Sequence, residues 1–185
     1  DDLAKPVLSF VEQAMSRELE MLGQTIGEVA LDLPNQQVVA NDVERTRSGV
    51  PFFRGELVRR YIACTLTYFC KVTGIGYKQG MNEILAPLIG VEFLVEAEDT
   101  PIIDPRPEEE GREWWAAWAR IYRMFCSWMK WWLPHAYQDE DFTALQSTCH
   151  LLRLLVRHHV PKLGAHLDRS ALPPELYAPP WLLTC

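Results

Sequence analysis

The chain has 185 residues and a formal net charge of -7 at pH 7; 48% of the residues are hydrophobic and 23% are charged. This composition can fill one core of good size, so we expect a single globular domain. The acidic balance argues against nucleic acid as a partner. There is no run of eighteen apolar residues and no signal-peptide pattern, so we expect a cytoplasmic protein without a transmembrane segment.

Hydrophobic periodicity predicts helices in the first half of the chain. The first is expected over residues 6–23, with Gly23 at its end. The second covers residues 56–73 and stops at Gly74. The third begins near Gly80 and is kinked by a proline, Pro87. We expect its buried face to carry Met81, Ile84, Leu85, Leu88 and Val91.

The second half of the chain is also predicted to be helical. Residues 96–112 combine acidic residues, proline and glycine without periodicity, so we expect an exposed loop there. A stripe at helical spacing follows, formed by Trp114, Trp118, Ile121, Phe125, Trp128 and Trp132. Its spacing favours a core helix over an exposed platform of aromatic rings. A further helix is expected up to His159, with Pro161 breaking it, and no segment alternates like a strand, so the fold class is all-α.

The sequence lacks the common motifs for disulfides or redox cysteines, metal sites, nucleotide binding and nucleophilic catalysis. The five cysteines are odd in number and have no CxxC spacing, so we interpret them as structural thiols. The histidines lack a tight set of accompanying ligands, so we assign no metal site. There is no Walker-type loop, dinucleotide fingerprint or nucleophile elbow, so we expect no nucleotide or other cofactor bound by the chain itself.

Two polar motifs remain: "VVANDVERT" at 38–46, the first motif, and "YKQGMN" at 77–82, the second motif. Taken singly, Arg45 can be a surface residue paired to a nearby carboxylate, and Gln79 can be a polar residue at a helix start. Taken together they are more informative. Arginine offers a fork suited to phosphate oxygens, and a glutamine amide can orient a water molecule. A phosphoryl hydrolysis site needs both functions beside Mg²⁺.

At this point the sequence resembles a known family. "NDVERT" is similar to the IxxDxxR motif, and "YKQGM" matches the YxQGM motif, of the TBC domain, the GTPase-activating domain for Rab small GTPases. The order of helix, turn, motif and helix over residues 57–89 and the W-x-L-T ending at residues 181–184 also resemble it. The resemblance spans about residues 36–185. Val39 stands where the first motif usually has Ile, and the family's more N-terminal Arg/Trp motif is absent.

The resemblance implies a mechanism in trans. Arg45 would be an arginine finger and Gln79 a glutamine finger, both inserted into the nucleotide site of a GTP-bound Rab, which carries the GTP and Mg²⁺ itself. Such a chain activates an enzyme and has no substrate of its own. The supporting site residues implied by the two motifs are Asp42, Thr46, Tyr77 and Gly80. Asp42 would orient Arg45 or cap its local loop, and Thr46 would hold that loop by a side chain to backbone bond. Tyr77 would anchor the second motif, and Gly80 would let the backbone approach a phosphate.

The resemblance also sets expectations for the whole chain. We expect residues 1–185 to form one multi-helix TBC domain that is incomplete at its start and lacks the family's C-terminal helices. Its role would be in vesicle trafficking and intracellular protein transport, with peripheral association with endomembranes through the partner left open. The alternative is a catalytically silent module that binds a Rab or serves as a trafficking scaffold. The motifs do not identify the Rab, the organelle or the oligomeric state.

Overall fold

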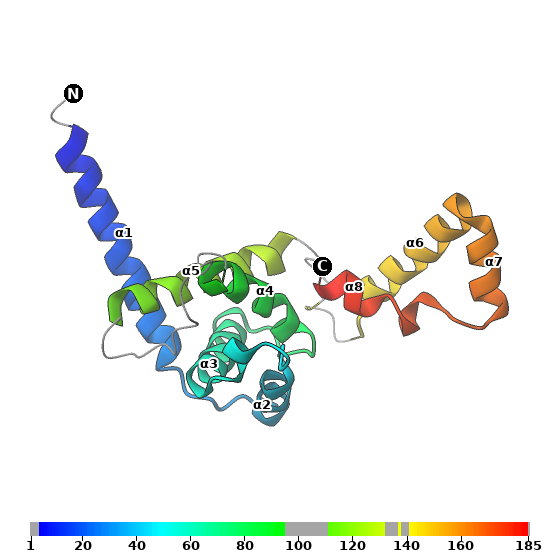
Figure 1. Cartoon of the computed structure of the whole chain (residues 1–185), viewed down its shortest axis with the longest axis horizontal. Coiled ribbons are helices and arrows are strands. Elements are labelled where there is room, and N and C mark those ends of the chain that lie inside the picture. The colour runs from blue at the N-terminus through cyan, green and yellow to red at the C-terminus, as the bar shows by residue number, and fades with distance from the viewer. Residues whose placement is uncertain (1–3, 95–110, 132–136, 138–140, 185) are drawn as a thin grey trace. The chain divides into compact units, whose positions relative to one another are not determined.

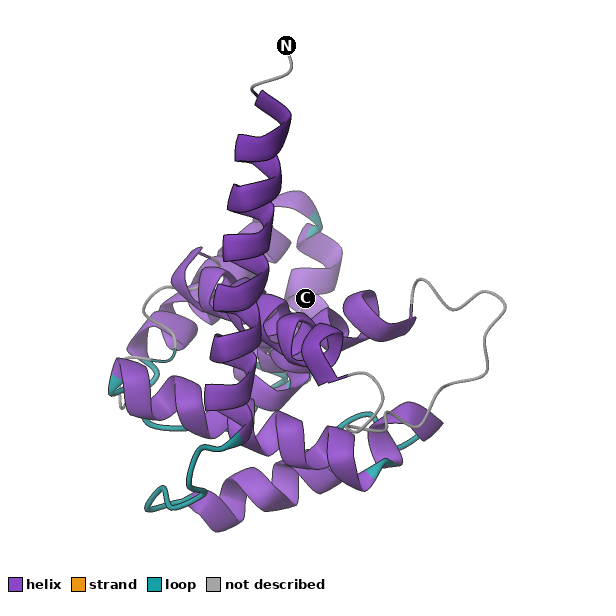
Figure 2. Ribbon diagram, turned by 90° about the vertical axis from the view of Figure 1, so that its left-hand side faces the viewer, coloured by secondary structure: helices purple, strands orange, loops and turns teal. Residues whose placement is uncertain are grey.

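A computed structural model describes residues 4–94, 111–131, 137 and 141–184. These residues form eight α-helices and two short 3₁₀ helices, and no strand occurs among them (Figure 2). The all-α prediction is therefore confirmed. By its internal contacts the chain divides into two compact units, residues 1–127 and residues 128–185. The predicted loop at 96–112 lies outside the described residues up to residue 110, and helix α5 already begins at Gly111.

The first unit is built around one central helix. Its elements are α1 (Ala4–Gly27), α2 (Gln36–Arg45), the 3₁₀ helix η1 (Pro51–Arg54), α3 (Glu56–Thr73), α4 (Met81–Leu94) and most of α5 (Gly111–Trp131). Helix α3 packs against α1, α2, η1 and α4, which lie around it in Figure 1. A helix contacted from several sides must be apolar on most of its surface, and ten residues of α3 are buried.

Helix α3 ends where the sequence predicts. Gly74 follows it with φ 72°, in the left-handed region that favours glycine, and its N–H donates to the Cys70 carbonyl at 2.9 Å. The chain can therefore turn directly from α3 into the second motif.

The stripe of α5 from Trp114 to Phe125 lies in the core of the first unit, as predicted, whereas Trp128 is half-buried and belongs to the second unit. Trp118 is completely buried and stacks on Tyr61 of α3, with ring centroids 5.1 Å apart. Trp114 meets both rings edge-on, and Phe93 of α4 closes the cluster. Helices α3, α4 and α5 are thus joined by ring contacts. Trp132, the last member of the predicted stripe, lies outside the described residues.

Helix α1 continues past the glycine that was predicted to end it. It runs to Gly27, so the predicted end at Gly23 is wrong. A Cβ atom added at Gly23 would lie 2.0 Å from the backbone oxygen of Trp115, and one at Gly27 would lie 2.6 Å from the Trp115 ring. The two glycines are one helical turn apart and let α5 approach α1 closely. Here the absence of a side chain serves helix packing.

We expect Gly23→Ala to destabilise the chain by about 1–3 kcal/mol or more, because the added methyl group meets backbone that must shift. Gly90→Ala in α4 is the matched control. Its Cβ would lie 3.9 Å from the nearest atom, so it should be neutral or stabilise by up to about 1 kcal/mol through helix propensity. Urea unfolding of both variants measures the difference. Equal stability of the two would show that the α1–α5 approach is not close.

Helix α4 agrees only partly with its predicted face. Met81, Ile84 and Leu85 are buried and Leu88 is half-buried, but the side chain of Val91 is 58% exposed. The assignment of Val91 to the core is therefore wrong. Pro87 lies inside the helix, as predicted. The buried face is therefore narrower than expected, although Ile89 is completely buried and Phe93 contacts Trp114 further along the helix.

The second unit contains a helical hairpin. Helix α6 (Thr143–His159) ends at the predicted residue, and Pro161 begins α7 (Pro161–Arg169), because proline at the first helical position needs no N–H partner. The 3₁₀ helix η2 (Pro174–Leu176) and α8 (Pro179–Thr184) follow, and both contact α6.

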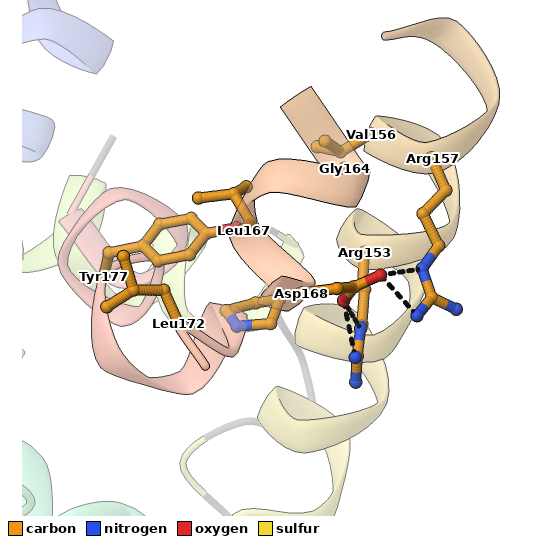
Figure 3. A pocket seen from close by; sticks show the side chains of 9 residues that line it. Arg153, Val156, Arg157, Gly164, Leu167, Asp168, Leu172 and Tyr177 are labelled. Carbon is orange, nitrogen blue, oxygen red and sulfur yellow. Dashed lines mark hydrogen bonds and ion pairs between the residues drawn. The ribbon is translucent and has the colours of Figure 1, made fainter. Parts of the chain in front are cut away.

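Two arginines of α6 clamp one carboxylate of α7. Arg153 binds Asp168 Oδ1 and Arg157 binds Oδ2, each through Nε and Nη2 at 2.6–3.0 Å (Figure 3). They border a small pocket that Leu167, Leu172 and Tyr177 also line. The hydrogen bond from Arg153, which has the larger effect, and the one from Arg157 hold the pKa of Asp168 below its ordinary value. Each guanidinium also satisfies one carboxylate oxygen, so the clamp is a structural link between α6 and α7.

The clamp predicts a pH dependence. The folded-state pKa of Asp168 is lowered, so its stabilising contribution is present above the ordinary carboxyl pKa and is lost as the pH falls through the folded value. We expect Asp168→Asn to lower the thermal unfolding temperature at neutral pH. The difference from the wild type should shrink in acid, which melting curves at a series of pH values will measure. A difference that does not change with pH would contradict the ionic origin of the clamp.

The cysteine thiols lie in poorly reactive surroundings. Cys64, Cys70 and Cys149 are buried, Cys126 is half-buried, and all four are free. Burial raises the pKa of Cys70 to about 11 and raises the pKa of the other three thiols as well. A raised pKa leaves little thiolate at neutral pH, which agrees with structural thiols. Cys185 lies outside the described residues.

Candidate functional site

The first motif forms the last turns of α2. Val39 and Asp42 are spaced three residues apart and both are buried against the core, with exposed fractions of 0% and 3%. Arg45 is the last residue of the helix, and its side chain is 70% exposed. The helix spacing thus puts an apolar anchor, a buried acid and an exposed base in sequence along one side of α2. The small change from Ile to Val at position 39 leaves the anchor in the core.

Asp42 holds Arg45 through one carboxylate oxygen. Arg45 Nη2 donates to Asp42 Oδ1 at 2.6 Å, and the other oxygen, Oδ2, accepts the Tyr77 hydroxyl at 2.9 Å. A buried carboxylate is tolerated when it is paired and hydrogen-bonded, and here both oxygens have partners. Arg45 is thereby held at one terminal nitrogen of its guanidinium, while its side chain as a whole remains largely accessible to a partner molecule.

Thr46 ends α2 with its side chain turned inward. Its N–H donates to the Asp42 carbonyl at 2.9 Å, and its hydroxyl donates to the same oxygen at 2.8 Å. The residue is 1% exposed, so the hydroxyl is satisfied within the fold. The predicted side chain to backbone bond is present, and it fixes the turn that follows Arg45.

The second motif is a short loop that leads into α4. Tyr77 is buried, Gln79 is exposed, and Gly80 has φ 103°, a conformation that suits glycine. The Gly80 carbonyl accepts from Glu83 N–H and Ile84 N–H at 3.0 and 3.2 Å, so α4 starts directly behind it. Gln79 therefore lies two residues before Met81, the first residue of α4. Among the described residues, the Gln79 side chain makes no hydrogen bond.

Asn82 completes the site and was not singled out by the sequence argument. It is 5% exposed, and its Nδ2 donates to Thr46 Oγ1 at 2.9 Å and to the Asp42 carbonyl at 3.4 Å. Its Oδ1 accepts from Gly80 N–H at 3.2 Å and lies 3.3 Å from the Tyr77 hydroxyl. A buried asparagine inside a mostly apolar helix is the signal that could have revealed it, since such an amide needs several partners.

Two peripheral contacts support the same arrangement. Asn35 Nδ2, just before α2, donates to the Tyr77 carbonyl at 3.0 Å. Arg47, which has φ 43°, pairs with Glu83 in the first turn of α4 at 3.2 Å. The side chains of Arg47 and Glu83 are partly exposed, so the pair contributes little to stability by itself. Both contacts nevertheless join the segments that carry the two motifs.

The structure brings the two motifs together through one buried hydrogen-bond network. This network consists of Asp42, Thr46, Tyr77 and Asn82. Two of its members, Thr46 and Asn82, are 36 residues apart in the sequence. Arg45 and Gln79 are exposed on the chain next to it. The arrangement offers a guanidinium and an amide to an external ligand, and the described residues contain no group of three or more His, Cys, Asp or Glu that could hold a metal ion.

Comparisons with known proteins agree on one family. The sequence model of the family described as the Rab-GTPase-TBC domain matches residues 12–185 of this chain. TBC1 domain family member 5 homolog B of Dictyostelium discoideum is 39% identical over 59 residues, which are 31% of this chain and 6% of that protein. The crystal structure of the Ypt/Rab-GAP domain of Gyp1p superposes with a TM-score of 0.75 at 16% identity, covering 93% of this chain. At that identity the superposition establishes the fold.

The chain is shorter than the proteins it matches. It covers 55% of the solved Gyp1p chain and 6% of the Dictyostelium protein. No helix in the described part of the chain is both long and apolar enough to span a bilayer.

Proposed function

Because the chain belongs to the Rab-GTPase-TBC domain family, we propose that it accelerates GTP hydrolysis by a Rab-family small GTPase in trans, with Arg45 as arginine finger and Gln79 as glutamine finger. GTP and Mg²⁺ would be carried by the partner, and the chain would bind no cofactor of its own. Vesicle trafficking at endomembranes, reached through the partner from the cytoplasm, is the setting that this proposal implies.

The observation that carries the proposal is the shared buried network. Arg45 is held by the Asp42 carboxylate, and the other oxygen of that carboxylate is held by Tyr77, two residues before Gln79. The segments that carry these two exposed polar side chains are thus joined by one buried hydrogen-bond network. Preorganised donors cost little to orient at the moment of reaction, which is the main way a protein stabilises a developing charge.

The roles of the two side chains follow from their chemistry. The permanently charged guanidinium of Arg45 would neutralise charge that develops between the β- and γ-phosphates of GTP. The Gln79 amide can both donate and accept, so it would orient the attacking water in place of the GTPase's own glutamine. Lysine at position 45 could not reproduce the fork, because its ammonium is a point charge.

Phosphate release from a panel of GTP-loaded Rabs tests the proposal. We expect stimulation of at least one Rab, and no GTP hydrolysis by the chain alone. The responsive Rab is then tested with its own catalytic glutamine replaced by alanine. Substantial stimulation of that variant supports the glutamine finger, since the water would be oriented from outside. Binding of GTP-loaded Rabs without stimulation of any of them would identify a silent binding module instead.

A further inference from the structure

We propose that Asn82 is a positioning residue: its buried amide locks the second motif, which carries Gln79, to the end of α2, which carries Arg45. The catalytic consequence of this lock rests on the function proposed above. The lock itself is a property of the chain alone.

The Asn82 amide bonds in both directions at once. Nδ2 donates to Thr46 Oγ1 at 2.9 Å, at the end of α2, and Oδ1 accepts from Gly80 N–H at 3.2 Å, in the second motif. This use requires a donor and an acceptor on one short, planar group. Aspartate has no donor and would bring a second carboxylate towards the buried Asp42, and alanine would leave the Gly80 N–H without its partner.

The bond to Gly80 bears directly on Gln79. The Gly80 N–H and the Gln79 carbonyl belong to the same planar peptide unit, so fixing that N–H fixes the backbone plane on the C-terminal side of Gln79. Gly80 itself has φ 103°, and its missing side chain leaves the backbone free to adopt other conformations. The hydrogen bond from Gly80 to Asn82 selects one of them. The direction of the Gln79 side chain is thereby constrained.

The donor side of the amide bears on Arg45. Asn82 Nδ2 lies 3.4 Å from the Asp42 carbonyl, the oxygen that also accepts the Thr46 hydroxyl. Thr46 directly follows Arg45 in the sequence, and the Asp42 carboxylate binds the Arg45 guanidinium. Asn82 therefore acts on both fingers through other residues and does not itself reach the partner, because it is 5% exposed.

Hydrogen exchange of the free protein tests the lock. In Asn82→Ala the Gly80 amide should exchange about tenfold faster than in the wild type, because its acceptor is gone. Thr46→Val is a second variant of similar shape that removes one anchor of Asn82 and should accelerate the same amide a few-fold. Ile89→Val, at a fully buried position of α4, is the control for general loss of stability. Gly80 exchange at the wild-type rate in both test variants would overturn the lock.

Stimulated hydrolysis tests the catalytic consequence with a responsive Rab. We expect Asn82→Ala to lower the maximal stimulated rate about tenfold or more while the half-saturating concentration changes little, and Ile89→Val to lower neither. Adding Asn82→Ala to a chain that already has Gln79→Ala should cost less than it does in the wild type, because the part of its effect that passes through Gln79 is already lost. A full additional loss, or a normal rate in Asn82→Ala, would contradict the positioning role. If no Rab responds, the proposed function has failed, and the exchange experiment alone decides the lock.

Discussion

Arg45→Ala should reduce the stimulated rate of GTP hydrolysis by at least about 10³-fold, the range in which arginine fingers act. Gln79→Ala should reduce it by about 10²-fold or more, the cost of losing one aligned hydrogen-bonding group at a developing charge. Phosphate release under single-turnover conditions measures both. The stimulated rate of the double variant should be only a little lower than that of the less active single variant, because both groups act on one transition state.

Stability must be followed in the same variants. Gln79 is exposed, so Gln79→Ala should leave the unfolding temperature unchanged. Arg45→Ala removes the cation from the buried Asp42 carboxylate and should cost about 1 kcal/mol, since water can replace the largely exposed guanidinium. Arg45→Lys should restore most of that stability and little of the activity.

Matched controls separate the site from general charge effects. Arg123 of α5 and Gln13 of α1 are exposed, and their replacement by alanine should leave stimulation intact. If the Gln79→Ala chain stimulates a normal Rab fully, and the wild-type chain fails on a Rab that lacks its catalytic glutamine, the glutamine finger is wrong. The second motif would then be a structural turn.

Trp118→Ala should destabilise the chain by about 3–5 kcal/mol, the largest loss of stability that we expect from one side chain. Trp118 is fully buried and contacts Tyr61, Phe93 and Trp114, so truncation leaves a cavity between three helices. Urea unfolding followed by far-UV circular dichroism measures the loss.

Trp131 provides the matched control in the same helix. Its side chain is 76% exposed, so Trp131→Ala should change the free energy of unfolding by less than about 0.5 kcal/mol. Equal effects at positions 118 and 131 would mean that the stripe of α5 is not the core.

The helices themselves were largely predictable from sequence, because apolar spacing, glycine stops and proline are local signals. Helix α3 ends before Gly74 and α6 ends at His159, as expected. Helices α2, α7 and α8 were not predicted, and two further errors occurred where a local signal had a tertiary purpose. Gly23 resembles a helix end, but its missing side chain makes room for Trp115, which is about ninety residues away in sequence. Val91 fits the apolar period of α4, but its side chain is 58% exposed.

The same division holds for the site. The sequence by itself determined the helical class and the two motifs, because helix periodicity depends on neighbours within a few residues and the motifs are contiguous. Only the tertiary structure decided that Asp42 is shared between Arg45 and Tyr77, and that Asn82 links Thr46 to Gly80. A hydrogen bond between segments 35 or 36 residues apart leaves no periodic trace in the sequence. It exists because α2 and the start of α4 both pack on α3, which brings their polar groups within bonding distance away from water.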